Sequence, residues 1–237
     1  MDARPETNRH VPEFGLVTGA FLSLSFLVAG LVLTGDVVRT LLTSVVILYP
    51  FAAYAITHSP DPTTVLPPRV TSALAVLVGV VLVGAVLADT EPSRVATELP
   101  YALFLGALVV LPAAAYHVTA GGADDRLNPL TPPQTVLVAT AVSVGLLAYG
   151  LLVGGVRFAA ATALSSFLAG SLYARARGER LARRTRRRFV AGGAACGVLV
   201  VLLGLLRGTA MESWLLVGLC LAAAPTFFYA LTAPERA

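Results

Sequence analysis

The feature that most constrains this chain is a series of long apolar segments separated by short polar ones. A helix needs about 20 mostly apolar residues to cross a bilayer. Lipid offers the backbone no hydrogen-bond partners, so a crossing segment must be helical. The sequence therefore predicts an all-α integral membrane protein, an eight-helix transmembrane bundle. Its expected spans are residues 14–34, 37–57, 70–88, 99–119, 135–153, 158–173, 189–206 and 213–232.

The charged residues support this interpretation by their scarcity and their positions. They make up 13% of the chain, about half the share that is usual in soluble proteins. They also fall almost entirely at or near the ends of the apolar segments. The segment 158–173 is the shortest and gives the weakest signal, which leaves a seven-span alternative. Gly154, Gly155 and Arg157 favour a turn before it and therefore eight spans.

The distribution of arginine predicts the orientation in the membrane. If the N-terminus is cytoplasmic, the cytoplasmic segments carry 13 of the 17 basic residues and the outer loops carry 4. Arginine-rich short loops stay on the cytoplasmic side. We therefore expect a multi-pass protein of the cell membrane with both termini in the cytoplasm. Its parts are a polar arm at 1–13, a single transmembrane domain at 14–232, an Arg-rich loop at 174–188 and a tail at 233–237.

A short motif recurs near the end of three even-numbered spans. It reads Pro-x-x-x-Tyr-x-x-Thr, and residues 169–173 form a degenerate copy in the sixth span. The steps between the four tyrosines are 62, 57 and 56 residues. This periodicity predicts four tandem helical hairpins in parallel orientation, an arrangement known among transporters. The alternative is that interfacial tyrosine and helical proline are simply common in membrane proteins. The motif residues are Pro50, Tyr54, Pro112, Tyr116, Tyr173, Pro225 and Tyr229.

The motif has a mechanical consequence. Proline lacks a backbone N–H and leaves the carbonyl four residues earlier without its usual donor. Those carbonyls belong to Val46, Leu108 and Leu221, and a neighbouring helix, a hydroxyl or water must satisfy them. Proline and tyrosine at positions i and i+4 share one helix face. We expect a ring of kinks and tyrosines near the cytoplasmic side, which either lines a cavity or packs.

Catalytic and metal-binding patterns are absent from the sequence. The chain contains no lysine, so it cannot form a retinal Schiff base. Its three histidines are too scattered for a metal site. No histidine follows Cys196 to act as a base, and both cysteines are expected to be packing residues. We expect no catalytic residue, no metal and no cofactor. Asp124 and Asp125 are adjacent carboxylates, but in a glycine-rich loop such a pair is usually only solvated.

The segment 174–188 is the most charged part of the chain, with eight arginines and one acid, Glu179. Such a cluster can bind anionic lipid headgroups or an acidic protein partner, or it can serve only to set the topology. Nucleic acid is unlikely, since no aromatic residue alternates with the arginines to stack on bases. The candidate lipid- or partner-binding residues are Arg175, Arg177, Arg180, Arg183, Arg184, Arg186, Arg187 and Arg188.

The sequence narrows the function without assigning an activity. It favours a permease-like protein or a membrane assembly component that has no catalytic chemistry of its own. The alternatives are a membrane-embedded lipid-modifying enzyme and a uniporter of a neutral or apolar small molecule. An enzyme should show clustered polar side chains facing one cavity, and a transporter should show a continuous polar cleft. An assembly component should show an apolar outer groove instead.

Overall fold

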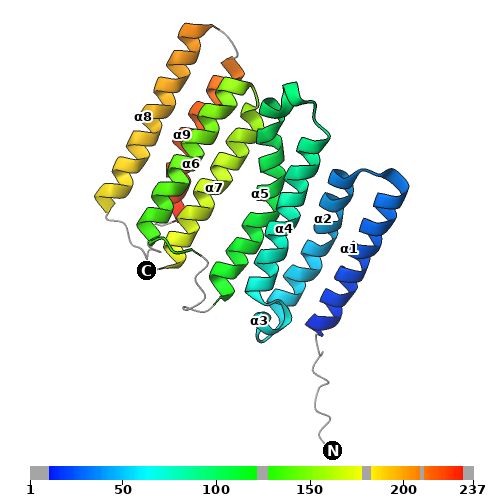
Figure 1. Cartoon of the computed structure of the whole chain (residues 1–237). Helices are drawn as coiled ribbons and strands as arrows, with labels where there is room; N and C mark the ends of the chain where they lie inside the picture. Colours follow the sequence, from blue (N-terminus) through cyan, green and yellow to red (C-terminus); the bar gives the residue numbers. More distant parts are fainter. Residues whose placement is uncertain (1–10, 122–127, 178–182, 209–210, 232–237) are drawn as a thin grey trace, which may run out of the picture. The chain divides into compact units, whose positions relative to one another are not determined.

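A computed structural model describes residues 11–121, 128–177, 183–208 and 211–231. For residues 183–186, 189 and 227–231 it describes the helix but not the side chains. The described chain is helical and contains no strand (Figure 1). The expectation of an all-α protein is therefore confirmed for these residues. The elements are α1 (Pro12–Thr34), α2 (Val37–His58), α3 (Pro62–Val65), α4 (Pro68–Ala88), the 3₁₀ turn η1 (Pro92–Arg94), α5 (Val95–Ala120), α6 (Pro132–Val153), α7 (Val156–Ala176), α8 (Arg183–Arg207) and α9 (Met211–Leu231).

The chain is a helical membrane protein by the length and composition of its helices. Among the described residues, six helices are long and apolar enough to cross a bilayer: α1, α2, α4, α5 with η1, α6 and the Val190–Arg207 part of α8. Helix α7 is not among these six, and the described apolar part of α9, Met211–Thr226, is shorter than they are. Each of the eight predicted spans overlaps one long helix, but eight membrane crossings remain a prediction.

Contacts between Cα atoms divide the chain into two compact units, residues 1–74 and 75–237. The first unit holds the antiparallel pair α1 and α2. Gly35 ends α1 in the left-handed conformation with φ 68°, and the Asp36 side chain caps α2 by accepting from the Arg39 amide. Gly19 lies directly against Phe51. The Ser23 hydroxyl donates to the Ser44 carbonyl across the pair at 2.8 Å.

The second unit contains three further helix pairs, each with a close approach between small residues. Gly79 of α4 lies against Gly106 and Val110 of α5. Gly170 of α7 lies against Ala139 of α6. The third pair, α8 with α9, has three close approaches that each involve a glycine, described below. Small residues let helix backbones come close, which strengthens packing where lipid gives no hydrophobic driving force between helices.

The α8–α9 pair is the most glycine-dependent of these. Gly197 and Gly218 face each other, and Gly204 lies against Trp214. Gly193 faces Pro225 and the carbonyl oxygen of Leu221, which is one of the carbonyls that a helical proline deprives of its donor. The backbone of α8 therefore approaches α9 closely at that carbonyl.

Helix α7 is the central helix of the second unit, since it contacts α5, α6 and α9. Its buried positions are mostly small or hydroxyl-bearing residues, including Ala160, Ala163, Gly170 and Ser171. A helix surrounded by protein needs less apolar surface than one surrounded by lipid. This explains why the segment 158–173 gave the weakest hydropathy signal of the eight predicted spans.

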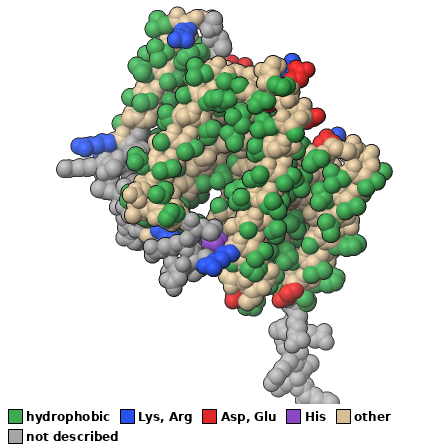
Figure 2. Space-filling model, viewed as in Figure 1, with side chains coloured by type: hydrophobic (Ala, Val, Ile, Leu, Met, Phe, Trp, Pro, Cys, Tyr) green, Lys and Arg blue, Asp and Glu red, His purple; other side chains and the backbone are tan. Residues whose placement is uncertain are grey.

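Within the second unit, the C-terminal ends of α5, α7 and α9 point the same way (Figure 1). The N-terminal ends of α6 and α8 lie at that same end. Figure 2 shows apolar side chains along the exposed helix faces, with charged side chains mainly toward the helix ends. Large apolar residues such as Leu137 and Leu152 are strongly exposed, as expected for surfaces that face lipid.

Candidate functional site

Much of the Arg-rich segment, residues 174–188, is helical and does not form a loop. Helix α7 continues to Ala176 and α8 begins at Arg183, so the predicted loop at 174–188 is shorter than its charge pattern suggested. Arg175 and Arg177 belong to the end of α7, whereas Arg187 and Arg188 lie exposed on α8. Arg180 lies outside the described residues, as do the side chains of Arg183, Arg184 and Arg186.

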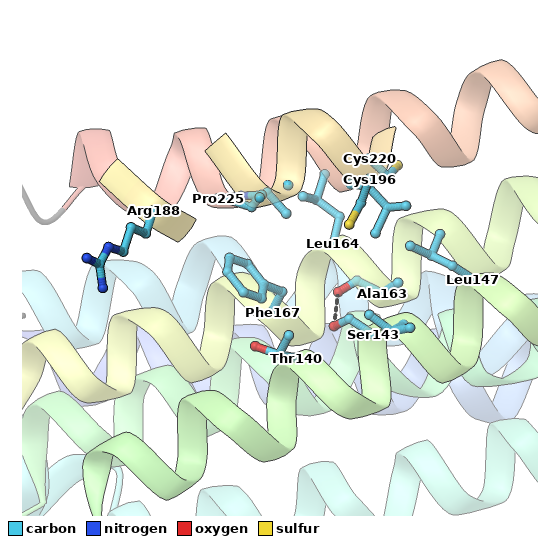
Figure 3. A pocket seen from close by; sticks show the side chains of 15 residues that line it. Thr140, Ser143, Leu147, Ala163, Leu164, Phe167, Arg188, Cys196, Cys220 and Pro225 are labelled. Atoms are coloured by element: carbon cyan, nitrogen blue, oxygen red, sulfur yellow. Dashed lines mark hydrogen bonds between the residues drawn. The ribbon is translucent and has the colours of Figure 1, made fainter. Parts of the chain in front are cut away.

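One cavity, here called the apolar groove, lies among α6, α7, α8 and α9. Its volume is about 390 Å³, within the range of pockets that hold small molecules. Leu147, Leu164 and Phe167 supply apolar walls from α6 and α7, and Leu221 and Pro225 supply them from α9. Arg188 stands at one end of the groove and Leu147 at the other (Figure 3). The groove thus joins an apolar body to a cationic end.

The polar groups within the apolar groove are few. The Ser143 hydroxyl donates to the Ala163 carbonyl of α7 at 2.7 Å (Figure 3), and the Thr140 hydroxyl donates to the Val136 carbonyl. Cys196 and Cys220 line the groove from α8 and α9. Both are free thiols, and Cys196 is exposed on α8, so it is a wall residue of an open groove and not a buried packing residue.

A second cavity, here called the polar cavity, lies where the ends of α5, α6 and α7 meet, and its volume is about 740 Å³. Leu111, Val118 and Leu172 give it an apolar wall, and its polar side chains include His117, Asn128, Tyr173, Arg175 and the α7 C-cap residue Arg177. His117 is 3% exposed. The described lining contains no Asp or Glu.

Hydrogen bonds fix the polar side of this cavity. The Asn128 amide group donates to the Thr135 hydroxyl at 2.7 Å, and the Leu130 amide donates to the Asn128 side-chain oxygen at 3.0 Å. Thr131 and Gln134 form a capping box that satisfies the first turn of α6. The α6 terminus is therefore already capped, and side chains, not helix amides, define the polarity of the cavity.

The guanidinium of Arg177 lies over the ring of Tyr173, 5.7 Å from its centroid. This is within the range of a cation–π contact. Its Nε is buried and has no hydrogen-bond acceptor among the described residues. A buried donor without an acceptor costs free energy, so a ligand that supplied an acceptor to this nitrogen would recover part of that cost.

A third cavity, of about 450 Å³, lies at the opposite end of the second unit. There Arg157 of α7 and Glu212 of α9 form an ion pair at 2.6 Å, with side chains 77% and 74% exposed. Both side chains line that cavity, together with Glu98 and Tyr101 of α5. An exposed pair of this kind contributes little stability, but it joins the N-terminal ends of α7 and α9.

The motif residues differ in their surroundings. Pro50, Pro112 and Pro225 all lie inside helices. Tyr54 stacks on His58 with ring centroids 4.2 Å apart, whereas Tyr173 lines the polar cavity. The side chain of Tyr229 lies outside the described residues, as do Asp124 and Asp125. No group of three or more His, Cys, Asp or Glu residues could hold a metal within the described chain.

No family model matches the chain, and neither a curated protein nor a solved structure is significantly similar to it. Fold and composition define the class as an all-α membrane protein. Sequence reasoning found the arginines, but it missed His117, Asn128 and Thr135 as partners in one cavity. Their sequence signal is weak because three separate segments contribute them.

Proposed function

We propose that this chain crosses the cell membrane eight times as four parallel hairpins, with both termini in the cytoplasm. The hairpins are α1–α2, α4–α5, α6–α7 and α8–α9. The arginine distribution carries the orientation, because 13 of 17 basic residues then fall on the cytoplasmic side. The orientation would bring the Arg-rich segment, the apolar groove's cationic end and the polar cavity to the cytoplasmic face.

Close helix contacts support the repeat independently of the tyrosines. In each hairpin a small residue of the first helix contacts the second helix near the motif's proline position. The contacts are Gly19 with Phe51, Gly79 with Val110, Ala139 with Gly170, and Gly193 with Pro225. The two partners of each contact are 32, 31, 31 and 32 residues apart in the sequence. A conserved spacing of this kind is expected if each hairpin is one copy of the same unit.

The threonine of the motif supports the repeat as well. The Thr57 hydroxyl donates to the carbonyls of Ala53 and Tyr54 at 2.9 and 3.2 Å. The Thr119 hydroxyl donates to the carbonyls of Ala115 and Tyr116, both at 3.0 Å. Both threonines bond back to the carbonyls four and three residues earlier in their own helix. The motif therefore gives the last turns of α2 and α5 the same side-chain hydrogen bonds.

We propose that the protein binds a lipid-like molecule in the apolar groove and acts as a permease-like or assembly component without catalytic chemistry of its own. The observation that carries this is the apolar body of the groove with Arg188 at one end. A chain with an apolar tail and an anionic head is complementary to both parts. Anionic lipid is the expected partner at the Arg-rich segment, a protein partner is the alternative there, and nucleic acid is not expected.

The enzyme and uniporter alternatives receive less support. A lipid-modifying enzyme needs acids or bases facing the bound lipid, and the described lining of the apolar groove contains no Asp, Glu or His. The acids Glu98 and Glu212 line the third cavity, away from the groove. A uniporter of a neutral or apolar small molecule needs a continuous path through the protein. The described cavities with polar side chains lie at opposite ends of the second unit, and the apolar groove supplies mainly apolar walls between helices.

The test fills the groove with a bulky side chain. Leu164 lines the groove, whereas Leu137 is 70% exposed on α6 and does not line it. Native mass spectrometry of protein extracted in mild detergent would measure co-purifying lipid. We expect Leu164→Trp to co-purify with less lipid than the unchanged protein, and Leu137→Trp to retain as much lipid as the unchanged protein. Equal retention in all three proteins would contradict the proposal.

A further inference from the structure

We propose that the polar cavity is a second and separate site, which binds the anionic phosphate headgroup of a phospholipid. The proposal rests on the membrane placement proposed above, but not on the occupant of the apolar groove. Its basis is the combination of Arg175, Arg177, His117 and the Asn128–Thr135 pair around one cavity of about 740 Å³.

The described charged side chains of the cavity suit an anion. Two guanidinium groups are among its lining residues, and no Asp or Glu is among those described. Guanidinium binds phosphate and carboxylate oxygens through paired N–H donors. Asn128 has a second amide hydrogen beyond the one it donates to Thr135. Arg177 and Asn128 therefore each bring N–H donors to the lining of this cavity.

Arg177 carries a buried donor that a ligand in the cavity could satisfy. Tyr173 holds its guanidinium from one face, which leaves the N–H donors at the edge of the group for other partners. The Nε donor is buried without an acceptor among the described residues. A phosphate oxygen would supply that acceptor through a charge-assisted hydrogen bond, which is about twice as strong as a neutral one.

The rest of the cavity identifies the phosphate as part of a lipid. Leu111, Val118 and Leu172 form an apolar wall beside the polar side chains. Leu111 and Thr119 both line the cavity, so it extends about 12 Å along α5 at 1.5 Å per residue. A soluble phosphate would leave this wall unused, whereas the upper part of an acyl chain or a glycerol backbone would cover it.

The test compares binding of two phospholipids that carry the same acyl chains, the anionic phosphatidylglycerol and the zwitterionic phosphatidylcholine. Binding to the full chain in detergent is followed by native mass spectrometry. The unchanged protein should bind phosphatidylglycerol more tightly. Arg177→Gln should weaken that binding about 10- to 100-fold, as expected for loss of a charged hydrogen bond, and should leave phosphatidylcholine binding nearly unchanged.

Arg187→Gln is the matched control, because Arg187 belongs to the same Arg-rich segment but lines neither cavity. It should keep the preference for phosphatidylglycerol. Arg177→Lys keeps the positive charge but loses the paired N–H donors of the guanidinium. It should bind phosphatidylglycerol with intermediate affinity. An unfolding midpoint measured for each variant separates loss of binding from loss of fold.

Two results would overturn the proposal. The first is an equal loss of phosphatidylglycerol binding in Arg177→Gln and Arg187→Gln, or no loss in either. The second is displacement of the lipid by sn-glycerol 3-phosphate at a concentration similar to that of the lipid itself, which would identify a soluble phosphate as the ligand. Leu164→Trp fills only the apolar groove, so failure of the groove proposal would leave the Arg177 result intact.

Discussion

The close approach of α8 to α9 can be tested by adding one methyl group. A Cβ at Gly193 would lie 2.5 Å from Pro225 Cγ and 2.6 Å from the Leu221 carbonyl oxygen. A rigid ring and a backbone atom cannot move aside as a flexible side chain does. Gly193→Ala must therefore push the two helices apart or strain them.

Overpacking of this kind costs about 1–3 kcal/mol, which is about a 5- to 150-fold change in the unfolding equilibrium. The neighbouring Gly192 is the control, since a Cβ there would meet no atom within 4 Å. Alanine is the better helix former, so Gly192→Ala should be neutral or stabilising by about 0.5–1 kcal/mol. The two adjacent substitutions should therefore have opposite effects or clearly unequal ones.

The assay is equilibrium unfolding in mixed micelles of a mild detergent and dodecyl sulfate. Trp214 is the only tryptophan in the chain and packs against Gly204 within the same helix pair. Its fluorescence reports directly on separation of α8 from α9. If Gly193→Ala unfolded at the same dodecyl sulfate fraction as Gly192→Ala, the inferred proximity of Gly193 to the Leu221 carbonyl would be wrong.

Three further predictions concern other contacts. Ser143→Ala removes a hydroxyl that is shared between the Ala139 carbonyl of its own helix and the Ala163 carbonyl of α7, each at 2.7 Å. It should cost about 0.6 kcal/mol, at most about 1.7, in the same unfolding assay. Ser165→Ala, whose hydroxyl bonds only within α7 to Ala161, should cost less, and equal costs would argue against the cross-helix bond. The exposed Arg157–Glu212 pair should show a coupling of under about 1 kcal/mol in a double-mutant cycle, decreasing with salt, and a large salt-independent coupling would contradict its exposure. The Thr63 hydroxyl and then its amide lower the pKa of the Asp61 carboxyl, so the stabilisation by this cap is present above the ordinary carboxyl pKa of about 3.9 and is lost as pH falls through the lower folded-state value. The Thr63 amide resonance should follow that transition below pH 3.9 and should stop doing so in Asp61→Asn; a midpoint at or above the ordinary value would refute the cap.

The sequence was sufficient to predict the helices but not to predict the cavities between them. Hydropathy identified the helices because each long apolar run encodes its own structure, and Pro132 stands at the first position of α6, where proline suits a helix start. Helix α7 gave a weak signal because protein surrounds it, so small residues replace large apolar ones. A local pattern cannot distinguish such a helix from a marginal span.

The candidate sites depend on which helices pair, and that information is spread along the chain. Arg177 and Arg188 look equivalent in the Arg-rich segment, yet they line two different cavities. His117 follows a motif tyrosine, and nothing in its local sequence indicates that it lies near Asn128 and Thr135. Only the packing of α5 and α7 around the start of α6 brings these side chains together.

The membrane topology is the central claim, and cysteine accessibility tests it most directly. In a variant with Cys196→Ala and Cys220→Ala, single cysteines would replace Ser59, Thr90, Arg157 or Glu212, and intact cells would be treated with a membrane-impermeant maleimide. Eight spans with a cytoplasmic N-terminus predict labelling at Thr90→Cys, Arg157→Cys and Glu212→Cys, and protection at Ser59→Cys. Labelling at Arg157→Cys with protection at Glu212→Cys would show that α7 or α8 does not cross the membrane, and labelling at Ser59→Cys would contradict the proposed orientation.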